Sequence, residues 1–231
     1  MHAAAADDET ILRLSIDAKA AVKIGPFSRN GKSRTIVNAA DHDFKPEATM
    51  TPFGIYLPDF GELFLYMTTS KITSDFIVDS LEAFWKEVRD RFPKVTTLLI
   101  NSDNGPETHS RRGALWAQLM NRLVAFADQQ QINLQLAYYP PYHSKYNPVE
   151  RVWGGLEQQW NGSLLDSIET VLAFARTFTW RTQKPVVTLV ERIYETGAKL
   201  SQKAMTQLEQ RFKRLNGLEK WFVTISPIPS T

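Results

Sequence analysis

The stretch Leu98-Leu99-Ile100-Asn101-Ser102-Asp103-Asn104-Gly105-Pro106 carries an apolar run into an aspartate and then into turn residues. A short apolar run bounded in this way predicts a buried β-strand that ends near Asp103. Residues Ile11–Asp17 repeat the plan, because alternating apolar residues lead to Asp17. Each aspartate also has an ordinary interpretation. Asp103 fits the turn chemistry of Asp-Asn-Gly-Pro, and Asp17 fits the surface of an edge strand.

A third carboxylate opens a predicted helix at Asn147-Pro148-Val149-Glu150. Pro148 suits the first helical position, where a backbone N–H has no partner, and Asn147 suits the N-cap. Glu150 then either closes a capping box on the N–H of the cap residue or serves as a metal ligand. Three carboxylates from separate elements repel one another unless a divalent cation neutralises them. Together, Asp17, Asp103 and Glu150 therefore indicate a metal site built from oxygen ligands.

This order of residues resembles the DDE transposases of bacterial insertion sequences. The second aspartate lies in Ser102-Asp103-Asn104-Gly105-Pro106-Glu107 and the glutamate in Tyr142-His143-Ser144-Lys145-Tyr146-Asn147-Pro148-Val149-Glu150. Over nearly its whole length, the chain resembles the Rhodopirellula-type transposase DDE domain. Further stretches that match that pattern are Ser15-Ile16-Asp17-Ala18-Lys19, Ile24-Gly25-Pro26-Phe27-Ser28-Arg29, Ala40-Asp41-His42-Asp43-Phe44 and Asn161-Gly162-Ser163-Leu164-Leu165-Asp166.

The resemblance implies an RNase H-like fold with a two-metal phosphoryl-transfer site. Carried over by position, Asp17, Asp103 and Glu150 are its catalytic residues and metal ligands. Two Mg²⁺ ions about 3.5–4 Å apart, replaceable by Mn²⁺, would flank one phosphate during strand cleavage and strand transfer. The implied partners are transposon ends, target DNA and a second copy of the chain, because transposition holds two element ends together.

Composition agrees with a packed enzyme domain. The 231 residues are 43% hydrophobic and 11% aromatic, which suits one sizeable α/β domain or one domain with a helical appendage. There is no cysteine, so disulfides and cysteine-ligated zinc are excluded. We expect no membrane span and no signal peptide, because the sequence has neither a long apolar run nor a basic leader, and we expect a cytoplasmic protein.

Periodicity predicts a mixed α/β order with a five-stranded sheet flanked by helices. The expected strands are Ile11–Asp17, Phe53–Leu57, Leu63–Met67, Val95–Asn101 and Ile132–Tyr139. The expected helices are residues 73–92, residues 112–130, the one that Glu150 opens, and three additional C-terminal helices at Ser167–Trp180, Val186–Thr196 and Ser201–Leu215. We therefore expect a leader at residues 1–10, a catalytic core at 11–160 and a helical C-terminal extension at 161–231 packed on the core.

Basic residues predict where DNA binds. The formal net charge is only +2, but no acidic residue occurs between Ala18 and Ala40. A segregated basic stretch is typical of phosphate binding, so we expect DNA contacts there. The residues concerned are Lys19, Lys23, Arg29, Lys32 and Arg34. The basic stretch Lys199–Lys220 is better explained as a solvated helix face.

Other side chains are candidates for DNA contact near the predicted metal site. Arg111 and Arg112 could hold phosphates as guanidinium forks, and His143 with Lys145 lies in the loop before Glu150. A structural hydrogen bond explains His143 equally well. Tyrosines at 138, 139 and 142 fit either stacking on unpaired bases or ordinary packing. Asp41-His42-Asp43 is better explained as structural or as auxiliary to DNA binding, since neighbouring side chains on a strand point to opposite faces. Glu107 could approach the metals, but a hydrogen bond within the turn explains it better.

Two other functions remain open. The same fold and metals would serve a stand-alone nuclease that cuts DNA or RNA without joining. A catalytically silent DNA-binding remnant of a transposase is the second, because no helix-turn-helix region precedes the first strand, Ile11–Asp17, in this sequence.

Overall fold

The computed structural model of the protein describes residues 8–27, 46, 48–103, 114–140, 143–195 and 201–229. Its strands are β1 (Ile11–Ala18), β2 (Val22–Ile24), β3 (Ala48–Leu57), β4 (Glu62–Thr68), β5 (Thr97–Ser102), β6 (Asn133–Tyr138), β7 (Val186–Leu189), β8 (Phe212–Arg214) and β9 (Phe222–Ile225). Its α-helices are α2 (Ser74–Val88), α3 (Ala114–Gln130), α4 (Pro148–Trp160), α5 (Ile168–Thr177) and α6 (Gln202–Glu209). Two short 3-10 helices are η1 (Arg89–Arg91) and η2 (Ser144–Tyr146).

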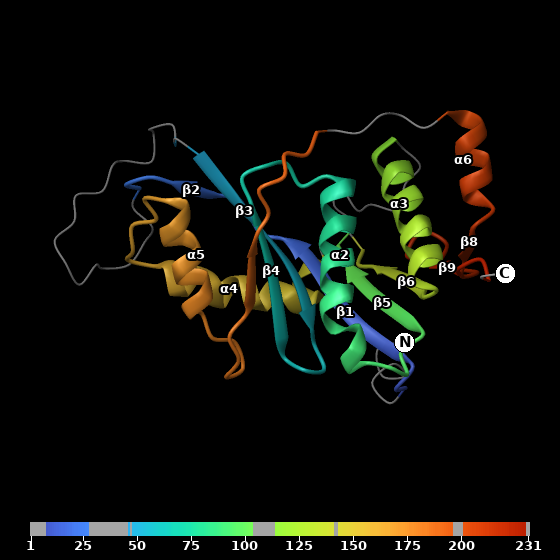
Figure 1. The fold of residues 1–231 in the computed structure, drawn as a ribbon, viewed down its shortest axis with the longest axis horizontal. Helices are drawn as coiled ribbons and strands as arrows, with labels where there is room; N and C mark the ends of the chain where they lie inside the picture. The colour runs from blue at the N-terminus through green and yellow to red at the C-terminus, as the bar shows by residue number, and fades with distance from the viewer. Residues whose placement is uncertain are drawn as a thin grey trace.

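The described strands form one mixed sheet of nine strands in the order β7-β4-β3-β1-β5-β6-β9-β8, with β2 paired to the start of β3 (Figure 1). β1, β5 and β6 are parallel neighbours, and one row of the sheet joins Ile16, Ser102 and Tyr138. Because parallel strands end at the same edge, the carboxyl ends of β1 and β5 lie together. This edge is where the two predicted strand-terminal aspartates fall.

Helices pack on both faces of the sheet. Along β1, alternation directs Leu14 and Ile16 to one face and Ser15 and Asp17 to the other. α2 and α3 pack side by side on the Ile16 face and bury a large apolar core there (Figure 1). α4 and α5 pack on the opposite face around a second apolar cluster. The carboxylate of Asp17 is therefore directed to the α4 side.

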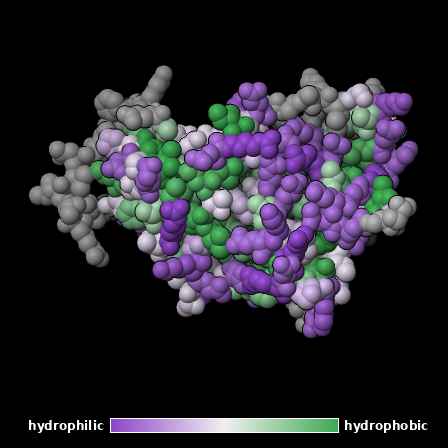
Figure 2. Space-filling model, in the orientation of Figure 1, coloured by the Kyte–Doolittle hydropathy of each residue, from purple (hydrophilic) through white to green (hydrophobic). Residues whose placement is uncertain are grey.

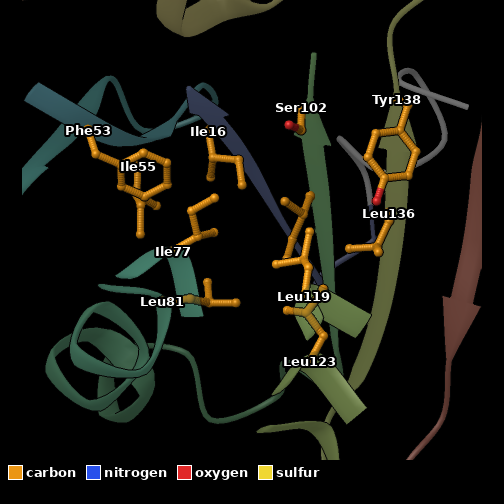
Figure 3. A pocket seen from close by; sticks show the side chains of 11 residues that line it. Ile16, Phe53, Ile55, Ile77, Leu81, Ser102, Leu119, Leu123, Leu136 and Tyr138 are labelled. Carbon is orange, nitrogen blue, oxygen red and sulfur yellow. The ribbon is translucent and has the colours of Figure 1, made fainter. Parts of the chain in front are cut away.

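The α2 and α3 side has a polar exterior and a closed interior. Hydrophilic residues cover the surface over α2 in Figure 2. Beneath it, a cavity of about 20 Å³ lies between the sheet and the two helices, lined mainly by aliphatic side chains such as Ile16, Leu81 and Leu119 (Figure 3). A space this small is a packing defect, because ligand sites measure roughly 300–1,000 Å³.

Most elements of the first 160 residues fall where the sequence predicts them. The β3–β4 hairpin turns through residues 58–61, with Gly61 at φ +72°, a left-handed conformation that suits glycine. Thr73 caps α2 by accepting a hydrogen bond from the Phe76 N–H at 3.2 Å. The short strand β2 was not predicted.

The C-terminal part differs from the prediction. Residues Val186–Leu189 form β7, a parallel neighbour of β4, so the helix predicted over Val186–Thr196 is wrong. The helix predicted over Ser201–Leu215 ends at Glu209, and β8 follows it. Together with β2 and β9, which were also not predicted, these two strands extend the sheet from the expected five strands to nine among the described residues. No helix in the described part of the chain is long and apolar enough to cross a membrane.

Candidate active site

Two adjacent parallel strands deliver Asp17 and Asp103. The register pairs Ile16 of β1 with Ser102 of β5, and each aspartate is the next residue along its chain. Tyr139 occupies the next position on β6, where its N–H donates to the Ser102 carbonyl at 3.0 Å. The backbone thus places Asp17, Asp103 and Tyr139 in consecutive positions along one edge of the sheet.

The start of α4 is fastened to β1 through Asn147. The buried amide of Asn147 donates from Nδ2 to the Ile16 carbonyl at 3.0 Å and accepts a hydrogen bond at Oδ1 from the Ser15 hydroxyl. The Val149 N–H donates in turn to the Ser15 Oγ at 2.9 Å. Asn147 occupies the N-cap position as predicted, but its side chain makes no capping bond. Its role is to fix the first turn of α4, and with it Glu150, against β1.

One turn further along α4, Trp153 contacts the first aspartate directly. Its indole Nε1–H donates to Asp17 Oδ2 at 2.9 Å. The ring lies against Gly54, the β3 residue that pairs with Asp17. A Cβ at position 54 would stand 2.6 Å from Trp153 Cη2 and 3.1 Å from Val149 Cγ2. Only glycine leaves room for the indole at this position.

The three predicted ligands interact electrostatically. The pKa of Asp17 is raised to about 7, mainly by burial and in smaller part by the negative charges of Asp103 and Glu150. The hydrogen bonds from Trp153 and from the backbone act in the opposite direction, because they stabilise the carboxylate. The ionised form of Asp17 is therefore disfavoured unless a positive charge joins the group.

The donor chemistry of this group suits a hard divalent cation. Carboxylate oxygens are the ligands that Mg²⁺ and Mn²⁺ prefer, and a cation would favour ionised Asp17. Among the residues that the structure describes, no three His, Asp or Glu side chains are grouped closely enough to hold a metal ion as they stand. Sharing an ion therefore requires the side chains of Asp17, Asp103 and Glu150 to move closer together.

Four of the predicted DNA-binding residues lie in the described part of the chain: Lys19, Lys23, His143 and Lys145. Lys19 forms an ion pair with Glu157 and lies 5.7 Å from the Trp160 ring, so α4 already neutralises its charge. Lys23 lies over the Phe27 ring at 5.5 Å and is exposed. His143 stacks on Tyr146, and Lys145 lies over the same ring; both are exposed before α4. DNA contact by these four residues stays a prediction.

Several predicted residues lie outside the described part of the chain. They are Arg29, Lys32, Arg34, Asp41, His42, Asp43, Glu107, Arg111, Arg112 and Tyr142.

Sequence reasoning missed Ser15, Gly54 and Trp153 as parts of this site. Gly54 carried a usable signal, because a glycine inside an apolar strand often marks a close approach of another group. Trp153 is three residues after Glu150 and therefore shares its helix face. The contact between Ser15 and Asn147 joins residues 132 positions apart and had no local signal.

The structure is a mixed α/β domain in which two adjacent parallel strands lead to aspartates and a helix beside them begins close to a glutamate, as the resemblance to the DDE transposases predicts. The chain belongs to the family described as the Rhodopirellula transposase DDE domain, which matches residues 2–227. The family prediction from the sequence is confirmed.

One solved structure to which the chain is similar is the Mos1 transposase paired-end complex with left transposon end. The similarity has a TM-score of 0.46 at 10% sequence identity and covers 71% of this chain and 45% of that chain. This chain therefore matches less than half the length of that transposase. No curated protein matches the sequence.

Proposed function

We propose that this protein cleaves and joins DNA by two-metal phosphoryl transfer in an RNase H-like fold, with Asp17, Asp103 and Glu150 as metal ligands. The observation that carries the proposal is the fastening of α4 to β1. Asn147 bonds to Ser15 and Ile16, and Trp153 bonds to Asp17, so Glu150 is held on the face that Asp17 occupies. A helix cap alone would need none of these contacts.

The three carboxylates share the task of holding the metal ions. Asp17, Asp103 and Glu150 would hold two Mg²⁺ or Mn²⁺ ions, which when bound activate the attacking oxygen and stabilise the leaving oxygen. Trp153 engages Oδ2 of Asp17 and thereby fixes the direction of Oδ1. No protein nucleophile is required, in keeping with a chain that has no cysteine.

The substrates follow from the family. We assign transposon ends as the DNA that is cut and target DNA as the acceptor, with two copies of the chain holding two ends. Water would be the attacking group in cleavage, and the freed 3′-hydroxyl would attack in strand transfer. The exposed Lys23, His143 and Lys145 are the described candidates for contacting the strand.

The test is an incubation of the protein with labelled duplex element ends, Mg²⁺ and a target plasmid. We expect nicked ends and joined products from the wild type, and neither from Asp103→Asn, because an amide does not neutralise a divalent ion. Cleavage without joined product would identify a nuclease instead. DNA binding with neither product would identify a silent DNA-binding remnant.

A further inference from the structure

Arg13 of β1 is a partly buried arginine held by neutral groups. Its Nε–H donates to Asn101 Oδ1 at 2.9 Å, and its guanidinium also bonds the hydroxyl of Tyr139. It makes no ion pair with any carboxylate that the structure describes. Arg13 lies on the same face of the sheet as Ser15 and Asp17, since side chains alternate along β1. This face is the one that carries the candidate active site.

Two other partly buried arginines show what is different about Arg13. Arg122 pairs with Asp75 and Asp79 at 3.0 and 2.6 Å, and Arg211 pairs with Asp128 at 2.7 Å. The protein therefore supplies carboxylates to those guanidinium groups. Arg13 has its fork oriented by Asn101 and Tyr139 while its positive charge stays uncompensated among the described residues. An oriented guanidinium of this kind suits a phosphate, which accepts two parallel N–H bonds.

A groove of about 390 Å³ lies on this face, and both partners of Arg13, Asn101 and Tyr139, belong to its lining. Its lining includes Leu99 and Asn101 of β5, Ala137 of β6, Tyr139, Pro140 and Phe222. The helices of this face pack over β1, β3 and β7, whereas the groove lies over β5, β6 and β9. Flat aromatic and aliphatic walls next to a cation are the features that bind unpaired nucleotides, because bases stack and phosphates pair with the charge.

Two lysines close to the groove agree with an anionic occupant in it. Lys213 of β8 pairs in register with Thr224, which places it on the groove side of the sheet, and its side chain is exposed. Lys220 is exposed in the turn before β9. The nearby Glu219 carboxylate accepts a hydrogen bond from the Gly217 N–H at 2.8 Å.

We infer that Arg13 and the adjoining groove bind an unpaired DNA strand that runs from the cleavage site, with one phosphate on Arg13 and a base against Tyr139 and Phe222. This assignment rests on the proposed DNA cleavage. Asp17 and Arg13 are four residues apart on one strand, roughly 13 Å at about 3.3 Å per residue. That span is at most about four nucleotide steps, because a strand in a duplex rises roughly 3.4 Å per step and an unpaired strand extends further. Arg13 would therefore contact the strand a few nucleotides from the cut.

The test measures equilibrium binding in EDTA, so that chemistry does not contribute. The probes are a fluorescein-labelled blunt duplex and the same duplex with a 3′ extension of ten thymidines. We expect the wild type to prefer the extended duplex at least tenfold, and Arg13→Met to lose that preference. Its slope of log affinity against log salt should fall by about 0.7, the value of one single-strand phosphate contact.

Three further variants keep the result interpretable if Arg13→Met is unstable. Asn101→Asp places a carboxylate against Arg13 and should abolish the preference while the melting temperature is retained. Arg13→Lys should keep part of it, because the charge remains. Arg89→Met is the matched control, since η1 lies at the opposite end of the sheet from the carboxylates, and it should bind like the wild type.

Position is tested by photo-crosslinking with 5-iodouracil placed along the extension. We expect crosslinks to Tyr139 or Phe222 from a base within a few nucleotides of the duplex junction. An unchanged preference in Arg13→Met and Asn101→Asp would overturn the inference, and altered self-association in the same variants would assign the groove to contacts between copies. Groove-dependent binding by a protein that cuts no DNA would instead overturn the proposed function, and only the binding of an unpaired strand by Arg13 and the groove would stand.

Discussion

Helix α4 is fastened to β1 by buried hydrogen bonds, whereas α3 is tied to α2 by ion pairs that reach the surface. In the first contact, Asn147 and Ser15 are completely buried and bond each other and the backbone. In the second, Arg122 is 28% exposed and joins three acidic side chains of α2. Buried polar bonds are geometrically strict, because an unmet donor or acceptor there costs free energy, while exposed ion pairs tolerate displacement. The strict contact, between α4 and β1, lies beside the predicted catalytic residues. The tolerant contact, between α3 and α2, lies over the apolar core on the other face of the sheet.

The largest expected effect is on activity at the strict contact. Glu150→Gln should reduce DNA cleavage by at least about 10³-fold, because the loss of one carboxylate charge weakens ion binding and transition-state neutralisation. Its unfolding free energy should stay within about 1 kcal/mol of the wild type, the scale of one helix cap. Cleavage rates and thermal melting check both parts. Full activity in Glu150→Gln would contradict the metal-ligand interpretation and support the interpretation of Glu150 as a helix-capping residue.

Asp17→Asn should abolish cleavage and also stabilise the metal-free protein at high pH. The pKa of Asp17 is raised in the folded state, so its contribution to stability is complete below the unfolded value of 3.8 and is lost as pH rises towards about 7. The asparagine variant avoids that loss, which amounts to at most about 4 kcal/mol for three pKa units. Melting in EDTA at pH 4 and pH 8 measures it. Equal wild-type and variant stabilities at pH 8 would contradict the raised pKa.

Asn147→Ala should destabilise the fold by about 2–4 kcal/mol, because Ser15 Oγ and the Ile16 carbonyl each lose a buried partner. Cleavage should fall with it, since the start of α4 is then free to shift. Gln159→Ala is the matched control on the same helix, because its amide bonds Thr177 at an exposed site. Chemical denaturation should place the two variants at least about 1 kcal/mol apart.

Gly54→Ala should cost about 1–3 kcal/mol, the usual penalty for overpacking, because the new methyl group meets the Trp153 ring. It should also raise the Mg²⁺ concentration needed for half-maximal cleavage and for thermal stabilisation by the ion. Gly154→Ala is the control, since a Cβ there meets nothing within 4 Å, and alanine in a helix interior should be neutral or stabilising. Trp153→Phe keeps an aromatic ring but loses the bond to Asp17, and should shift the Mg²⁺ requirement in the same direction.

The smallest effect is expected at the tolerant contact. Arg122→Met should change the unfolding free energy by about 1 kcal/mol or less, because partly exposed ion pairs contribute little. It should leave cleavage unchanged, since α2 and α3 lie on the face away from Asp17. A loss of activity in Arg122→Met would show that this surface takes part in the reaction, and would remove the contrast between the two contacts.

Local patterns were enough for the elements that carry the three carboxylates. The apolar runs before Asp17 and Asp103 predicted β1 and β5, and Pro148 predicted the start of α4, because these signals lie within a few residues of the element they define. The C-terminal strands were not predictable in this way. β7 has only four residues and pairs with β4 more than 100 positions earlier. Its short apolar run fits helical spacing, but pairing with β4 makes it a strand.

The sequence by itself determined the family, the order of the central strands and the three candidate ligands, since these depend on residue type and local spacing. The tertiary structure alone decided how the ligands are held. Ser15, Gly54, Asn147 and Trp153 converge from three elements. Gly54 carries a local signal of a close approach, but no local pattern identifies Trp153 as the group that approaches it or joins Ser15 to Asn147. That no described carboxylate pairs with Arg13 is also a property of the fold, because whether a guanidinium has an acidic neighbour depends on chain segments distant in sequence. The sequence states the chemistry of each side chain directly, whereas the packing of distant segments determines which side chains become its neighbours.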